Sequence, residues 1–139
     1  MAELQATDAP KSGIQVVEDF LDALKALDVD RALRMMSEDV VYQNVPLPAD
    51  RGKRAVARTL KRMLRALTEF DVRMHNIAER DGVVLTERTD IGRGPWVDLE
   101  FWVCGTFEVE DGKIRLWRDR FDWAIFVAQL ATGPLRRLR

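Results

Sequence analysis

The chain has 139 residues, of which 47% are hydrophobic and 32% are charged, and its formal net charge is -1. This length and composition predict a single folded domain over residues 1–139 with its own hydrophobic core. The interspersed charges argue against nucleic acid as a partner, and no apolar run reaches the roughly 20 residues that cross a membrane.

The N-terminal part of the chain predicts two helices. Residues 1–11 are polar and without period, which is typical of a flexible leader. Ser12 can cap a first helix that ends near Asp28, because apolar residues recur along it at three- and four-residue steps. Asp30 can cap a short second helix that runs through Met36.

A strand and a third helix follow. Residues 40–44 are typical of a strand that Pro46 ends, so Tyr42 and Asn44 share one face of it. Residues 52–68 have the apolar stripe of an amphipathic helix, and we interpret the basic residues on its other face as solvated.

The period then changes from helix to strand. Strand-like segments cover residues 70–80, 83–90, 97–109 and 114–122. Asp81-Gly82 and Asp111-Gly112 predict tight turns between antiparallel strands, and residues 92–95 are expected to form a hairpin loop. The residues after Phe121 are compatible with a short terminal helix that covers either the mouth of a pocket or a partner, and the sequence does not decide which. We therefore expect an α+β fold, in which a curved mixed or antiparallel β-sheet wraps around the N-terminal helices as a cone with a deep apolar pocket.

The sequence lacks the residue patterns of several common catalytic and metal-binding sites. The G-x-S-x-G elbow of serine hydrolases does not occur, and His75, in a strand-like segment, is interpreted as a surface or hydrogen-bonded histidine. No spacing of ligands suggests a metal. Cys104 stands among apolar residues, which predicts a packed, inert thiol. With one cysteine and no signal-peptide pattern, we expect a cytoplasmic protein.

Polar residues cluster at three places within the strands. Tyr42 with Asn44 and Arg88 with Asp90 stand two residues apart, and Asp119 lies in the last strand. Residues at i and i+2 share one face of a sheet, so these groups can meet inside the cone. A structural ion-pair network or a solvated face is the alternative interpretation.

Three segments resemble the signature segments of limonene-1,2-epoxide hydrolases, in the same order. They are Tyr-Gln-Asn-Val-Pro-Leu-Pro at 42–48, Leu-Thr-Glu-Arg-Thr-Asp at 85–90, and Gly-Lys-Ile-Arg-Leu-Trp-Arg-Asp-Arg-Phe-Asp at 112–122. The likeness extends over about residues 14–126. It implies the cone-shaped fold shared with ketosteroid isomerases, polyketide cyclases and nuclear transport factor 2, and a homodimer that uses no cofactor and no metal.

The resemblance also implies a role for each polar residue. Asp119 matches the general base, and Tyr42 and Asn44 match the residues that hold the nucleophilic water with it. Asp90 matches the general acid, and Arg88 matches the bridge between the two aspartates. Water would then add to an epoxide in one step, without a covalent intermediate, because two carboxylates can divide the acid and base roles.

Arg88 creates an electrostatic conflict in this scheme. Arg88 favours ionised carboxylates, whereas Asp90 needs a proton to act as an acid, so burial has to outweigh the arginine. We expect the two aspartates to titrate as a coupled pair.

The expected substrate is an apolar, terpene-like epoxide, because the remaining pocket candidates are apolar. These substrate-binding candidates are Leu33, Met36, Met63, Val84, Trp102, Trp117 and Phe121. The sequence departs from the family pattern at Arg120, where a tyrosine is usual, and in the short segment 91–97, so the natural substrate stays open. An isomerase of the ketosteroid type would leave Asn44 and Arg88 without a task, and a lipid or sterol carrier would not need five buried polar residues.

Overall fold

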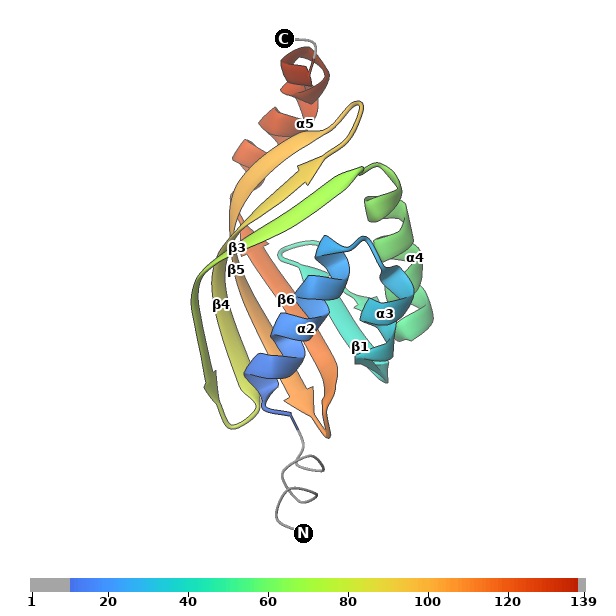
Figure 1. Cartoon of the computed structure of the whole chain (residues 1–139), viewed down its shortest axis with the longest axis vertical. Helices are drawn as coiled ribbons and strands as arrows, with labels where there is room; N and C mark the ends of the chain where they lie inside the picture. Colours follow the sequence, from blue (N-terminus) through green and yellow to red (C-terminus); the bar gives the residue numbers. More distant parts are fainter. Residues whose placement is uncertain (1–10, 138–139) are drawn as a thin grey trace.

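The computed structural model describes residues 11–137, so most of the predicted leader lies outside the described residues. None of the helices in this range is long and apolar enough to cross a bilayer. In chain order (Figure 1) the elements are α2 (Gly13–Lys25), α3 (Val29–Arg34), β1 (Met36–Asn44), β2 (Asp50–Arg51), α4 (Lys53–Arg65), β3 (Glu69–Arg80), β4 (Val83–Arg93), β5 (Asp98–Glu110), β6 (Lys113–Phe121) and α5 (Trp123–Arg137).

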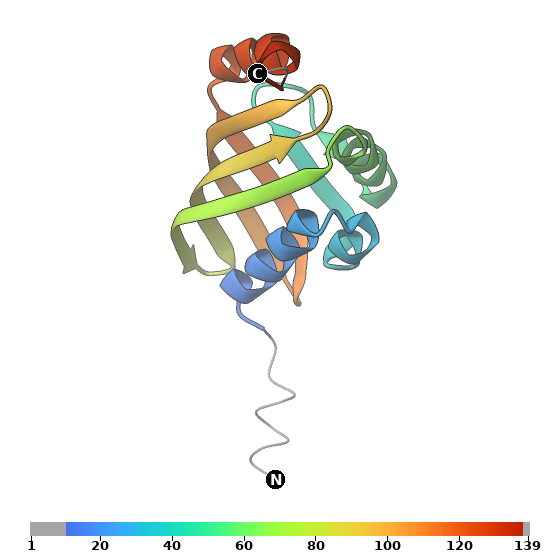
Figure 2. The ribbon, with the colours of Figure 1, turned by 45° about the horizontal axis from the view of Figure 1, so that its top comes forward.

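The strands form a single curved sheet in the order β2-β1-β6-β5-β4-β3. Neighbouring strands are antiparallel except for β1 and β6, which run parallel. The sheet curls around α2, and α3 and α4 complete the same side (Figure 2). This is the α+β architecture expected from the sequence, with one face of the sheet turned toward the helices.

The start of α2 is fixed by two sets of hydrogen bonds. The Ser12 hydroxyl accepts from the Gln15 backbone N–H at 3.1 Å, which confirms the predicted cap. The Glu79 carboxylate of β3 accepts from the backbone N–H groups of Gly13 and Ile14, each at 3.1 Å. A carboxylate at this end also interacts favourably with the helix dipole, so α2 is tied to the edge strand of the sheet.

Both predicted tight turns are present. Asp81 and Gly82 have φ of 52° and 79°, and Asp111 and Gly112 have φ of 54° and 74°. Two successive positive φ values are required by the hairpin turns whose twist matches that of the strands. Asp and Gly tolerate this conformation, which is why the dipeptides mark the β3–β4 and β5–β6 connections.

Some of the predicted details are wrong. Asp28, not Asp30, caps the second helix, since its carboxylate accepts from the Arg31 backbone N–H at 3.0 Å. Gly92 belongs to β4 rather than to the hairpin loop. Cys104 is exposed rather than packed, because it lies on the outer face of β5.

The core is centred on Phe20 of α2. Its ring is fully buried and meets the edges of Phe107 and Trp117 at centroid distances of 6.1 and 5.0 Å. These two aromatic residues face the helices from β5 and β6. Phe20 therefore holds α2 against the strands that carry the polar residues of the sequence analysis.

We predict that Phe20→Ala lowers the free energy of unfolding by about 3 to 5 kcal/mol, because it removes a buried ring and leaves a cavity. Glu18→Ala, on the exposed side of the same helix, is the control and should stay within about 0.5 kcal/mol of the wild type. Urea denaturation measures both values. Equal effects of the two substitutions would contradict the central place of Phe20.

Candidate active site

The strand register brings polar residues from β1, β6 and β4 into one row that crosses β5 at a glycine. Asn44 of β1 pairs with Asp119 of β6, Asp119 pairs with Gly105 of β5, and Gly105 pairs with Thr86 of β4. Arg88 lies two residues further along β4 on the same face. The three clusters noted in the sequence thus meet on the concave side of the sheet.

Arg88 lies between the two aspartates and is fully buried. Its Nε donates to Asp90 Oδ1 at 2.8 Å, and its Nη2 donates to Asp90 Oδ2 at 3.2 Å and to Asp119 Oδ2 at 2.7 Å. Its Nη1 donates to the Thr86 hydroxyl at 2.9 Å. Every nitrogen of the guanidinium therefore has an acceptor, as a buried cation requires.

The row continues on β1 through Tyr42 and Asn44. The Asn44 side-chain amide donates to the Tyr42 hydroxyl at 2.9 Å, and the Tyr42 ring stacks on Trp117 at a centroid distance of 4.0 Å. Burial and the nearby charge of Asp119 raise the pKa of Tyr42 above its ordinary value. The phenol therefore keeps its proton, and its hydroxyl donates to Met63 Sδ at 3.9 Å.

The two carboxylates have different surroundings although both are buried. Burial raises the pKa of Asp90 to about 6 from an ordinary value of 3.8, against the lowering effect of Arg88. Desolvation outweighs the arginine at this position, which is the balance that the sequence analysis required. Asp119 Oδ1 accepts no hydrogen bond from any described residue, whereas its Oδ2 is held by Arg88.

These polar groups lie at one side of a cavity of about 270 Å³. Its polar lining residues are Tyr42, Asn44, Arg88, Asp90 and Asp119. The rest of the wall is mainly apolar and includes residues of α2, α4, β3, β4, β5, β6 and α5, with Leu21, Leu60, Met63, Leu99, Phe101 and Phe126 among them. An apolar cavity with a few convergent polar groups is the usual form of a small-molecule site.

Comparison with known proteins gives the chain its family. The sequence model of the limonene-1,2-epoxide hydrolase catalytic domain matches residues 11–132. The chain belongs to the limonene-1,2-epoxide hydrolase family. It is 45% identical over 123 residues to epoxide hydrolase EphG of Mycobacterium tuberculosis, which covers 88% of this chain and 78% of that protein.

Solved structures agree with this assignment. An LEH-like epoxide hydrolase of M. tuberculosis has a TM-score of 0.80 at 40% identity, over 91% of this chain and 94% of the other. A SnoaL-like protein from Shewanella denitrificans has a TM-score of 0.79 at 17% identity, over 86% and 97% of the two chains, and shows the shared fold alone. The chain is therefore an epoxide hydrolase of the limonene-1,2-epoxide hydrolase type.

The structure places three of the seven predicted substrate-binding residues in the cavity wall, namely Met63, Trp117 and Phe121. Met36 and Val84 are fully buried in the core instead, and Leu33 packs against that core. Their helical and strand periodicity marks them as buried, but it does not separate the core from the cavity wall.

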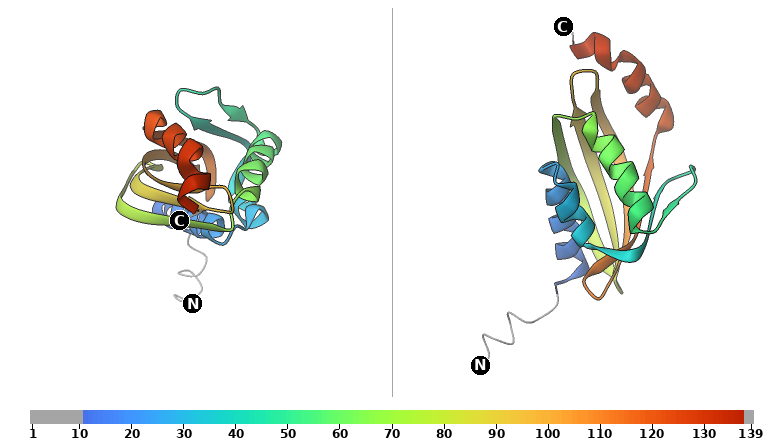
Figure 3. Two further views of the ribbon diagram at one scale, coloured as in Figure 1. Left: turned by 90° about the horizontal axis from the view of Figure 1, so that it is seen from above. Right: turned by 90° about the vertical axis from the view of Figure 1, so that its right-hand side faces the viewer.

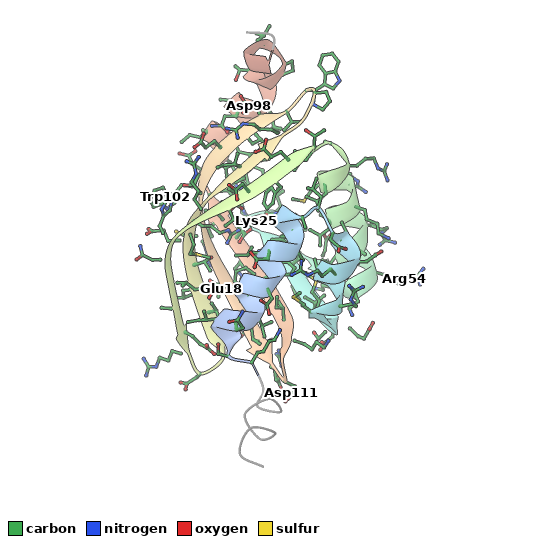
Figure 4. All side chains as sticks on the ribbon, viewed as in Figure 1. Glu18, Lys25, Arg54, Asp98, Trp102 and Asp111 are labelled. Atoms are coloured by element: carbon green, nitrogen blue, oxygen red, sulfur yellow. The ribbon has the colours of Figure 1, made fainter. Side chains whose placement is uncertain are left out.

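Trp102 lies outside this cavity, contrary to the prediction. Its side chain is 54% exposed and points away from the helices (Figure 4), where it stacks on His75 at a centroid distance of 4.5 Å. Its neighbour Phe101 faces the cavity instead, because adjacent strand residues point to opposite faces. His75 has a further contact with the Thr89 hydroxyl at 2.8 Å, so it is a hydrogen-bonded histidine outside the site, as expected.

The expected terminal helix is α5, which lies across one end of the sheet (Figure 3), but none of its residues was among the predicted site residues. Trp123, Phe126 and Leu130 of this helix line the cavity. The Trp123 indole N–H donates to the Val45 carbonyl at 2.7 Å, and the Gln129 amide exchanges two hydrogen bonds with the backbone of β5. The apolar residues after Phe121 were the available signal, but they did not indicate what the helix covers.

The raised pKa of Asp90 predicts a pH-dependent stability. Between about pH 4 and 6 the folded protein binds a proton that the unfolded chain releases, so ionised Asp90 lowers the free energy of unfolding as pH rises. The free energy of unfolding of Asp90→Asn, relative to that of the wild type, should therefore increase by about 1 to 3 kcal/mol between about pH 4 and pH 8. Urea denaturation at both pH values measures this difference. A constant difference would contradict the raised pKa.

Proposed function

We propose that this protein adds water to an apolar, terpene-like epoxide in one step and releases a vicinal diol, without a covalent intermediate or a cofactor. The observation that supports this proposal most strongly is the sharing of one buried guanidinium by two buried carboxylates at the side of an apolar cavity. Hydrolysis of an epoxide needs one base and one acid, and such a pair can supply both.

Asp119 is the proposed general base. Asn44 pairs with Asp119 in the β1–β6 register, and its side-chain amide donates to the Tyr42 hydroxyl. We propose that Asp119, Asn44 and Tyr42 together hold the nucleophilic water. As the water oxygen forms its bond to an epoxide carbon, its proton passes to the Asp119 carboxylate. The unused hydrogen-bonding capacity of that carboxylate supports this role.

Asp90 is the proposed general acid. A carboxyl group with a pKa of about 6 is substantially protonated at mildly acidic pH and is a stronger acid than water at any pH. It gives its proton to the epoxide oxygen as the carbon–oxygen bond breaks. Each turnover leaves Asp119 protonated and Asp90 ionised, and one proton returns from Asp119 to Asp90 before the next substrate. Arg88 stays charged throughout, since the adjacent carboxylates raise its pKa despite burial.

We further propose a small apolar substrate and a homodimeric state for this enzyme. An apolar substrate is supported by the cavity wall, and its volume of about 270 Å³ favours a small molecule. A homodimer is supported by large apolar side chains on the outer face of the sheet, where Leu85 and Trp102 are each 54% exposed. A cytoplasmic location stays a prediction from the sequence.

Single-turnover hydrolysis in oxygen-18 water tests the chemistry. The wild type, incubated with limonene-1,2-epoxide and with a panel of other apolar epoxides, should give labelled diol in the first turnover, because the oxygen comes from water and not from an enzyme carboxylate. Asp119→Asn and Asp90→Asn should each lose about 10²- to 10⁴-fold in rate, the usual contribution of an acid or base.

Asp71→Asn is the matched control, since its side chain is 45% exposed and lies outside the cavity. It should retain wild-type activity. Unlabelled diol in the first turnover would contradict direct attack by water and indicate a covalent intermediate. Saturable binding of the epoxides without any diol would favour a carrier.

A further inference from the structure

Arg88 reaches Asp119 by crossing an intervening strand. It projects from β4 and Asp119 projects from β6, and β5 lies between them. The β5 residue that faces Asp119 in the register is Gly105. A Cβ at this position would lie 2.4 Å from Arg88 Nη1 and 2.8 Å from Asp119 Oδ1. Only the absence of a side chain at position 105 leaves space for the guanidinium to pass over β5.

Thr86 holds the third side of the guanidinium. It is 4% exposed, and its hydroxyl accepts from Arg88 Nη1 at 2.9 Å. The same hydroxyl donates its hydrogen to the Gly105 carbonyl at 3.4 Å. Because a hydroxyl has one hydrogen, this donation turns its lone pairs toward Arg88. Thr86 is therefore an acceptor of fixed direction on the side of Arg88 opposite Asp90.

We propose that Thr86 and Gly105 are positioning residues that keep the Arg88 guanidinium shared between Asp90 and Asp119. This inference rests on the roles proposed above for the two aspartates. Thr86 and Gly105 act through Arg88 and do not touch the reacting atoms. They are also directly opposite each other in the β4–β5 pair.

The guanidinium has an alternative to its position between the two aspartates, which is an ion pair with Asp90 alone. Nε and Nη2 already contact both oxygens of Asp90, at 2.8 and 3.2 Å, so a simple two-pronged ion pair with Asp90 is close in geometry. The hydrogen bond from Nη1 to Thr86 opposes a movement of the guanidinium from Asp119 toward Asp90. Without the hydroxyl, we expect the guanidinium to settle on Asp90 and to move away from Asp119.

A guanidinium that moves from Asp119 toward Asp90 would reduce the protonated fraction of the general acid at a given pH. Arg88 and Asp119 are the charged groups that act on Asp90, and burial is the largest cause of its raised pKa. A guanidinium that settles on Asp90 favours its ionised form and lowers its pKa. The rate of a reaction that needs protonated Asp90 would then decline at a lower pH than in the wild type.

Thr86→Val and Thr86→Ser separate positioning from packing. Valine keeps the approximate volume and removes the hydroxyl, whereas serine keeps the hydroxyl. We expect Thr86→Val to lower kcat by about 10- to 100-fold, the value of a hydrogen bond to a charged group, with KM nearly unchanged. The alkaline limb of its kcat profile should move to lower pH. Thr86→Ser should restore most of kcat and the wild-type profile.

A crystal structure of Thr86→Val gives a result that does not depend on turnover. We expect Arg88 to keep its hydrogen bonds to Asp90 and to lose its hydrogen bond to Asp119. Gly105→Ala is a second variant, which should lose activity and show the same displaced arginine. A Thr86→Val variant with wild-type kcat, pH profile and Arg88 position would overturn the inference while leaving the proposed function intact. A wild type without hydrolase activity on any epoxide, but with the displaced arginine in the variants, would overturn the proposed function alone.

Discussion

The neutrality of a buried ion cluster is the constraint on which this site depends. Arg88 is fully buried, and Asp90 and Asp119 are 7% and 5% exposed. One ionised carboxylate neutralises the guanidinium, and a second would leave an excess negative charge in a medium that solvates it poorly. The cluster is therefore best accommodated with one aspartate ionised and the other protonated. An enzyme that needs a base and an acid next to each other obtains both from the same electrostatic balance.

The fold determines which carboxylate has which surroundings. The parallel pairing of β1 with β6 places Asn44 beside Asp119 in the sheet. Asp90 instead faces Phe101 across the β4–β5 pair and has Arg88 as its charged contact. Phe20 of α2 packs against the aromatic residues of β5 and β6, and α5 adds apolar residues to the cavity wall. The sheet supplies the polar row, and the helices supply apolar residues that line the same cavity.

Local features were predictable because their causes lie within a few residues. The Asp-Gly turns, the Ser12 cap and the shared face of Arg88 and Asp90 all follow from neighbouring residues. Thr86 and Gly105 were not found, because their contact with the site depends on a register that joins residues about 20 positions apart. The outward position of Trp102 was not predictable, because two adjacent aromatic residues do not show which of them faces the cavity. The exposure of Cys104 was not predictable for the same reason, since it shares the outer face of β5 with Trp102.

A titration of Asp90 by carbon-13 NMR of its labelled carboxyl group, in the wild type between about pH 4 and 9, measures the proton that the mechanism requires. Asp90→Asn identifies the resonance. The account predicts an apparent pKa of about 6, well above that of an ordinary aspartate. A pKa at or below the ordinary value of 3.8 would show that Arg88 overcomes burial, and Asp90 could not then serve as the acid.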